Sequence, residues 1–61
     1  MKYYGEYIMT LTYEDALEAC KVAKKKLPKR RRAVTLGGEG NVIFQLVNTG
    51  RGTFDIEGVR L

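Results

Sequence analysis

Hydrophobic and polar positions change their spacing along this chain, from alternation to a helical period and back to alternation. Residues 2–11 are rich in aromatic and β-prone types, with Tyr7, Met9 and Leu11 at every second position. This pattern predicts a strand with one well-buried face. Gly5, near the start of the segment, favours a bulge there.

A helical spacing follows at about residues 13–26, with start and stop signals at its ends. Thr12 can cap the first free amides, and Asp15 stands where the acid of a capping box lies. Leu27 precedes Pro28, which disfavours further helix. Apolar residues at steps of three and four predict one stripe that packs on a sheet. The stripe consists of Tyr13, Ala16, Leu17, Cys20, Ala23 or Lys24, and Leu27.

Three strand-like segments come next, at residues 32–36, 41–48 and 53–57, separated by glycine-containing turns at 37–41 and 49–52. Glycine supplies the positive φ that such turns need. The middle segment is mostly apolar on both sides, which predicts a central strand. The last segment alternates, which predicts an inward and an outward side before a glycine interrupts it. Its inward residues are Phe54 and Ile56, its outward residues are Asp55 and Glu57, and the interrupting glycine is Gly58.

The predicted element order is β-α-β-β-β, which is an α+β fold, and one small domain occupies residues 1–61. We expect a four-stranded, mostly antiparallel sheet with one helix packed on one face. The last three strands should form an antiparallel meander. If the first two strands run parallel, the helix joins them in a right-handed crossover.

Composition limits how this domain can be stabilised and where it functions. A chain of 61 residues buries only about 60% of its potential surface. One cysteine and no histidine exclude an internal disulfide and a four-ligand zinc site, so no cofactor is predicted. Self-association as a homodimer would help so small a core. The unpaired Cys20 and the absence of an apolar leader favour the cytoplasm, and no apolar run is long enough for a membrane span.

Charge is distributed unevenly. The chain has a formal net charge of +4, yet outside residues 21–32 it has three basic and seven acidic residues. Eight of its eleven basic residues fall in that window, which contains no acid, and they form what we call the basic segment. Its members are Lys21, Lys24, Lys25, Lys26, Lys29, Arg30, Arg31 and Arg32.

Placed at the end of the helix and on the connector beyond it, the basic segment is expected to form one patch. Such a patch can neutralise phosphates of a nucleic acid or contact the ribosome. Three other interpretations stay open, namely a solvated loop, docking on an acidic protein surface, and contact with an anionic membrane. Arg51, on the second glycine turn, is a further candidate contact.

Other residues point less clearly to chemistry. Cys20 lies on the apolar stripe without a histidine to act as base, so packing is expected and no enzyme is predicted. The loop at 37–41 lacks the spacing and the Lys-Ser/Thr ending of a phosphate-binding loop. Asp55 and Glu57 are expected to be solvated. Four tyrosines could stack on unpaired bases, although we expect the last two to close the core and the first two to lie at its edge. They are Tyr3, Tyr4, Tyr7 and Tyr13.

A local resemblance adds to this picture. The segment Ala16-Leu17-Glu18-Ala19 through Lys26-Leu27-Pro28, with the basic stretch after it, resembles one family of large-subunit ribosomal proteins over less than a third of the chain. The glycine-rich hairpins do not match that family, so no functional residue is carried over. The β-α-β-β-β layout with an acid-started helix also resembles short phage or mobile-element proteins that inhibit host machinery.

Two hypotheses follow for function. The first is a non-catalytic module that binds RNA or DNA backbone through the basic segment without strong sequence readout. The second is a small inhibitor of phage type that binds a host protein or nucleoprotein complex, through the same basic surface or through a strand edge. Neither requires a small-molecule substrate.

Overall fold

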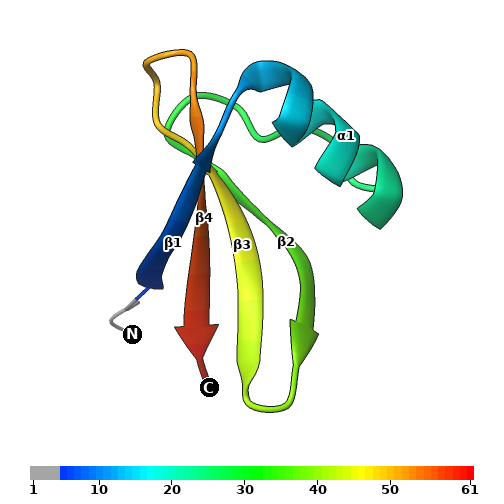
Figure 1. Ribbon diagram of the computed structural model, residues 1–61, viewed down its shortest axis with the longest axis vertical. Helices are drawn as coiled ribbons and strands as arrows, with labels where there is room; N and C mark the ends of the chain where they lie inside the picture. The colour runs from blue at the N-terminus through cyan, green and yellow to red at the C-terminus, as the bar shows by residue number, and fades with distance from the viewer. Residues whose placement is uncertain (1–4) are drawn as a thin grey trace.

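The computed structural model describes residues 5–61 and contains four strands and one helix (Figure 1). All strand pairs are antiparallel and form one sheet with the order β1-β4-β3-β2. The predicted α+β fold is therefore confirmed, with a sheet that is antiparallel throughout. The elements are β1 (Gly5–Leu11), α1 (Tyr13–Ala23), β2 (Ala33–Glu39), β3 (Val42–Asn48) and β4 (Phe54–Arg60).

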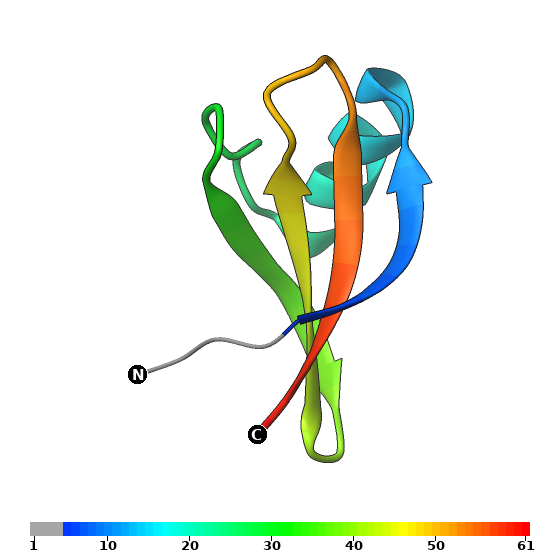
Figure 2. The same ribbon diagram turned by 90° about the vertical axis from the view of Figure 1, so that its left-hand side faces the viewer.

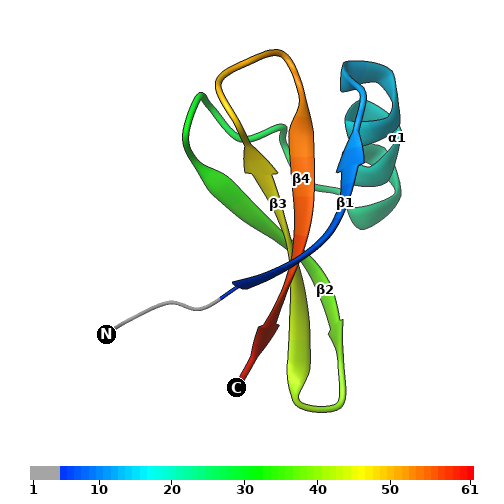
Figure 3. The same ribbon diagram turned by 60° about the vertical axis from the view of Figure 1, so that its left-hand side comes forward.

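Strands β2, β3 and β4 form the predicted meander, and β3 is a central strand as its two apolar sides indicated. β1 pairs with β4, so β1 and β2 lie at opposite edges of the sheet. The conditional prediction of a parallel crossover between them therefore does not apply. Instead, α1 and the connector after it carry the chain over one face of the sheet, from one edge to the other (Figure 3).

The core lies between α1 and that face of the sheet. Within residues 5–61, four residues are buried, namely Ala16 and Cys20 from α1, Leu46 from β3 and Phe54 from β4. The small side chains of Ala16 and Cys20 let the helix lie close to the strands. Five partly buried side chains complete the cluster, namely Leu11, Leu27, Val34, Leu36 and Ile56.

The helix is shorter than predicted, because it ends at Ala23 and not near residue 26. Lys24 has φ 57° and ψ 42°, which is the left-handed region. Its amide donates to the Lys21 carbonyl at 3.2 Å, and the Lys25 amide donates to the Cys20 carbonyl at 2.8 Å. These two bonds close the helix in a Schellman motif. Residues 24–26 therefore belong to the connector.

Two glycine segments differ from the prediction. β2 continues through Gly37 and Gly38 to Glu39, so the predicted loop shrinks to a tight turn at residues 40–41. Gly40 has φ 62° and is the first of the two loop residues, the position at which type II′ hairpins need glycine. Gly58 does not interrupt β4, which stays in register with β3 as far as Arg60.

The irregularity expected near Gly5 lies instead at Ile8, between Tyr7 and Met9. Ile8 takes up the space above Gly58, because its Cδ1 lies 3.4 Å from where a Cβ of Gly58 would be. The shift pairs Tyr7 with Glu57 on the face away from α1, whereas Met9 pairs with Ile56. The predicted single buried face of β1 is therefore wrong, and residues 5–10 are all exposed.

Candidate nucleic-acid interface

The basic segment is exposed along its whole length. All eight of its basic residues are exposed, and so is Arg51 on the loop between β3 and β4. Among residues 5–61, no acidic side chain forms an ion pair with any of these nine. Their charges are therefore available to an anionic partner.

Three consecutive arginines of the segment lie in one β-turn. The Arg32 amide donates to the Lys29 carbonyl at 2.8 Å, and Arg31, at the third turn position, has φ 61°. A positive φ at that position is the mark of a type II turn, which favours glycine or asparagine. An arginine there costs about 1 kcal/mol or more. The turn therefore presents three cationic side chains at the expense of local stability.

Asn48, the last residue of β3, holds this turn against the sheet. Its main chain accepts from the Arg31 amide at 3.0 Å and donates to the Arg32 carbonyl at 2.9 Å. Its side-chain Nδ2 donates to the Pro28 carbonyl at 3.1 Å, and its Oδ1 accepts from the Gly50 amide at 2.9 Å. One residue thus joins the connector to the β3–β4 loop.

The β3–β4 loop is a closed turn that carries Arg51. The Thr49 hydroxyl donates to the Thr53 carbonyl at 3.0 Å and accepts from the Arg51 amide at 3.2 Å. Gly50 and Gly52 have φ of 81° and 86°, so both positions favour glycine. The expected hairpin turn with an exposed arginine is confirmed. Because Arg30 lies against Gly50, this loop and the arginine turn are neighbours.

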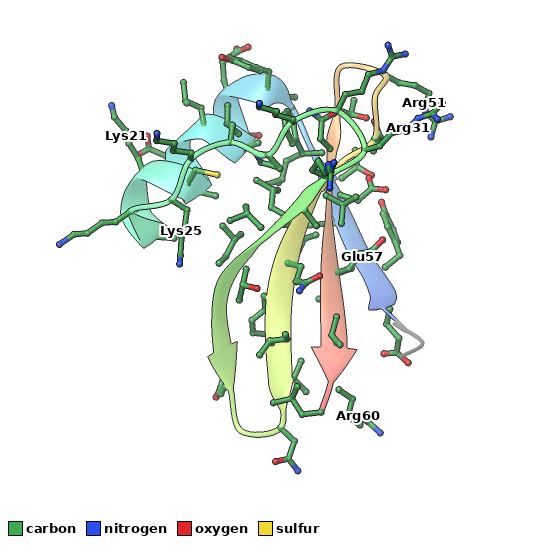
Figure 4. The ribbon with its side chains drawn as sticks, turned by 180° about the vertical axis from the view of Figure 1, so that it is seen from behind. Lys21, Lys25, Arg31, Arg51, Glu57 and Arg60 are labelled. Carbon is green, nitrogen blue, oxygen red and sulfur yellow. The ribbon has the colours of Figure 1, made fainter. Side chains whose placement is uncertain are left out.

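The structure separates the basic residues into two groups. Figure 4 shows Lys21 in the last turn of α1 and Lys25 just beyond the helix, with Arg31 and Arg51 on the other side of the molecule. The lysine group (Lys21, Lys24, Lys25 and Lys26) occupies the end of the helix and the start of the connector. The arginine group is Arg30, Arg31, Arg32 and Arg51, on the two neighbouring loops. Lys29 opens the arginine turn. The basic residues therefore form two groups at the two ends of the connector, and not the single patch expected from the sequence.

A hollow lies beside the arginine group. It has a volume of about 430 Å³ and is lined by Tyr13, Arg30, Asn48, Gly50, Gly52 and Phe54. Adding a Cβ to Gly50 would place it 3.1 Å from the Nε of Arg30, so the arginine side chain lies directly over this glycine. A second hollow, of about 320 Å³, lies between Glu6, Ile8, Val42, Gly58 and Arg60. It contains no member of the basic segment.

The face of the sheet away from α1 carries two carboxylates. Register places Asp55 and Glu57 there, with Thr10 and Tyr7 opposite them on β1. Thr10 donates to the Asp55 carboxylate at 2.9 Å and is hydrogen-bonded to the Tyr7 hydroxyl at 2.8 Å. The outward orientation predicted for Asp55 and Glu57 is confirmed. An anionic partner would therefore meet the loops at one end of the sheet and not this face.

The tyrosines do not close the core as expected. Tyr7 is 63% exposed and Tyr13 is 53% exposed. Tyr13 touches the core only at its edge, with its ring centroid 6.3 Å from that of Phe54 and a tilt of 53° between the rings. Tyr3 and Tyr4, expected at the edge of the core, lie outside the described residues. Tyr13 thus presents an aromatic surface beside the hollow.

Cys20 is buried, as its place on the apolar stripe predicted. Burial raises the pKa of its thiol by desolvation. A protonated thiol is a poor nucleophile, so this residue contributes packing. Within residues 5–61, no group of three or more His, Cys, Asp or Glu side chains is placed to hold a metal ion.

Sequence reasoning missed three residues of this site. The sequence predicts Asn48 as the end of a strand, Tyr13 as a core residue and Gly50 as part of a turn. Their shared role depends on chain segments that are distant in sequence. The only local signal was the asparagine itself, placed directly before a turn-forming Thr-Gly pair.

Comparison with known proteins found no matching family model, no matching curated protein and no matching solved structure. Nor does the described part of the chain contain a helix with the length and apolar character needed to cross a membrane.

Proposed function

We propose that this protein is a non-catalytic module that binds RNA or DNA through its basic segment and Arg51. The observation that carries the proposal is the arginine turn beside the Arg51 loop. Arginine offers forked hydrogen bonds that match phosphate oxygens, and contacts of this kind depend on the backbone and not on base sequence. The contacts are expected to be those of the arginine group, with the lysine group adding longer-range attraction.

The backbone conformation of the turn supports this assignment. Arg31 occupies a left-handed position that glycine would fill at lower cost. The turn is held by the main chain and by Asn48, so none of the arginine side chains is needed to close it. Three exposed arginines without an acidic partner among residues 5–61, one of them in an unfavourable backbone conformation, are best explained by an anionic partner.

The test is charge reversal at the turn, by Arg30→Glu, Arg31→Glu and Arg32→Glu together. This triple variant moves the formal net charge from +4 to −2, because each exchange subtracts two charges. Fluorescence anisotropy with a labelled mixed-sequence 16-mer, single-stranded and duplex, measures affinity at several salt concentrations. Wild type should show affinity that falls steeply with salt, with a log–log slope of about −3 if four arginines contact a single strand. The affinity of the triple variant should be lower than that of wild type by a factor of about 100 or more.

The matched control is Lys24→Glu, Lys25→Glu and Lys26→Glu, which makes the same change in net charge on the lysine group. This control should lose much less affinity than the arginine triple variant. Circular dichroism should show both variants folded, because the hydrogen bonds at residues 29–32 are main-chain bonds. If the arginine triple variant binds as tightly as wild type, the proposal is wrong.

A second candidate is an inhibitor that binds a host protein. It is favoured by the two sheet edges, since β1 and β2 each have a strand neighbour on one side only within the described residues. An unpaired edge can accept a strand from another protein. A pull-down from nuclease-treated host lysate separates the candidates, because a stoichiometric protein partner that survives nuclease treatment supports inhibition.

A further inference from the structure

The hollow beside the arginine group combines an aromatic ring, a cationic side chain and two residues without side chains. Three segments build it, namely the start of α1 (Tyr13), the arginine turn (Arg30), and the β3–β4 loop with its flanking strand ends. Figure 2 shows these segments together at the same end of the molecule. The sheet topology brings them together, although they are 17 to 41 residues apart in the sequence.

Tyr13 is fixed in place and still accessible. It is the first residue of α1, directly after the cap in which the Thr12 hydroxyl accepts from the Asp15 amide at 3.2 Å. Its ring meets the buried Phe54 at a tilt, which supports one part of the ring and leaves about half of the residue exposed. A ring held in this way needs little ordering before another planar group can stack on it.

Arg30 and the glycines define the opening of the hollow. The Arg30 side chain lies across Gly50, with its Nε and Cγ closest to that residue. Gly52 has no atom within 4 Å of the position a Cβ would take, so this part of the opening is free. The volume of about 430 Å³ is within the range of sites that hold a small ligand.

We infer that this hollow holds one unpaired base of a single-stranded nucleic acid, stacked on Tyr13, while Arg30 and Arg51 contact the flanking phosphates. The inference rests on the proposed function and narrows it from nucleic acid in general to single strands. In a duplex the faces of internal bases are covered by their neighbours, whereas a single strand can turn a base outward onto an aromatic side chain. Stacking on a ring is tolerant of base identity.

The experiment compares three labelled 12-mers of equal charge per strand, namely oligothymidine, an abasic strand with the same phosphates, and oligothymidine annealed to its complement. Anisotropy at one fixed salt concentration gives the affinities. Wild type should bind oligothymidine about tenfold more tightly than the abasic strand, as expected for one stacked base. It should also prefer the single strand to the duplex.

Tyr13→Ala should lower the affinity for oligothymidine about tenfold and leave the affinity for the abasic strand unchanged. Tyr13→Phe keeps the ring, so its affinity should stay within about twofold of wild type. Tyr7→Ala is the matched control, because Tyr7 is also an exposed tyrosine but lies on the face away from α1. Thermal unfolding checks that each variant is folded.

A second pair of variants tests the position of Arg30 without removing a charge or a ring. Gly50→Ala would push the Arg30 side chain aside, whereas Gly40→Ala imposes a similar positive-φ strain on the distant β2–β3 turn, where nothing lies within 4 Å. Only Gly50→Ala should weaken binding, by several-fold.

The outcomes separate the two proposals. If wild type binds the abasic strand as tightly as oligothymidine and Tyr13→Ala changes nothing, the stacking site is wrong while backbone binding through the arginines stands. If no strand binds at all, or binding is unaffected by reversal of the three turn arginines, the proposed function itself is wrong.

Discussion

Two basic residues, Lys24 and Arg31, adopt the left-handed backbone conformation, with φ of 57° and 61°. Both positions are ones at which glycine is preferred, since it has no Cβ to meet the following carbonyl. Lys24 closes the helix, and Arg31 is the third residue of the arginine turn. At each, a positive charge has been placed where the backbone alone would favour glycine.

Exchange of either residue for glycine should therefore raise stability. Lys24→Gly and Arg31→Gly are each expected to increase the free energy of unfolding by about 0.5–1 kcal/mol. Both remove one charge, so they form a matched pair for binding. Arg31→Gly should weaken nucleic-acid binding several-fold more than Lys24→Gly, measured by anisotropy beside urea denaturation. Equal affinities for the two variants would contradict the assignment of the contacts to the arginine group.

The buried thiol of Cys20 predicts a dependence of stability on pH. Its folded-state pKa is raised by desolvation, so the unfolded chain loses the thiol proton first. The stabilisation is therefore complete below the unfolded-state pKa, about 8.5, and is lost as pH rises through the folded-state value. Urea denaturation of wild type and Cys20→Ala between pH 7 and 10 isolates this effect. The difference in unfolding free energy between the two proteins should stay constant up to about pH 8. Above that pH, wild type should lose stability relative to Cys20→Ala. A constant difference over the whole range would contradict the prediction.

At the scale of the elements, a short helix covers only part of one face of the sheet. α1 ends at Ala23, and four residues of the described part of the chain are buried in the core. Ile8 and Met9 on β1 and Leu17 on α1 are each between 43% and 49% exposed. With so small a core, the hydrogen bonds that hold the connector and the β3–β4 loop account for a large share of local order.

Asn48 is the residue on which that order depends. Asn48→Ala removes the bonds from Nδ2 to the Pro28 carbonyl and from the Gly50 amide to Oδ1 but keeps the main-chain bonds. The expected loss is about 1–2 kcal/mol of unfolding free energy, with weaker nucleic-acid binding because both arginine-bearing loops gain freedom. Chemical denaturation and anisotropy measure the two effects.

The control for this variant is Asn41→Ala, at the other end of β3. Asn41 is exposed, and its main-chain carbonyl accepts from Leu61 at 2.7 Å, which the exchange retains. This variant should change stability by no more than about 0.5 kcal/mol. If the two asparagine variants are equally stable, the role assigned to the Asn48 side chain is wrong.

At the scale of the whole molecule, charge is distributed unevenly over the fold. The basic segment has eight positive residues and no acid, while the remainder of the chain has a net charge of −4. Figure 4 places Arg31 and Arg51 at one end of the sheet and Arg60 at the opposite end. The strand register places Glu57 on the face away from α1. Such a distribution favours approach to a polyanion in one orientation.

The sequence by itself determined the element order, the strand-rich C-terminal half and the location of the charge. A run that is apolar on both sides predicted β3 as a central strand, and alternation predicted the sides of β4. Thr12 and Asp15 predicted the helix start. These features depend on neighbouring residues, whose periodicity and capping chemistry are local. For the same reason the basic segment could be recognised without a structure.

Only the tertiary structure decided which basic residues lie together and what lies beside them. The pairing of β1 with β4 and the shift at Ile8 result from main-chain bonding between distant segments. The end of α1 at Ala23 is closed by local bonds, but neither glycine nor proline at that position signals it in the sequence. Those contacts separate the lysine group from the arginine group and bring Tyr13 beside Arg30 and Gly50. The sequence shows which residues are charged and with what period the apolar residues recur. It does not show which side chains 17 or more residues apart become neighbours, because that depends on the order of the strands in the sheet.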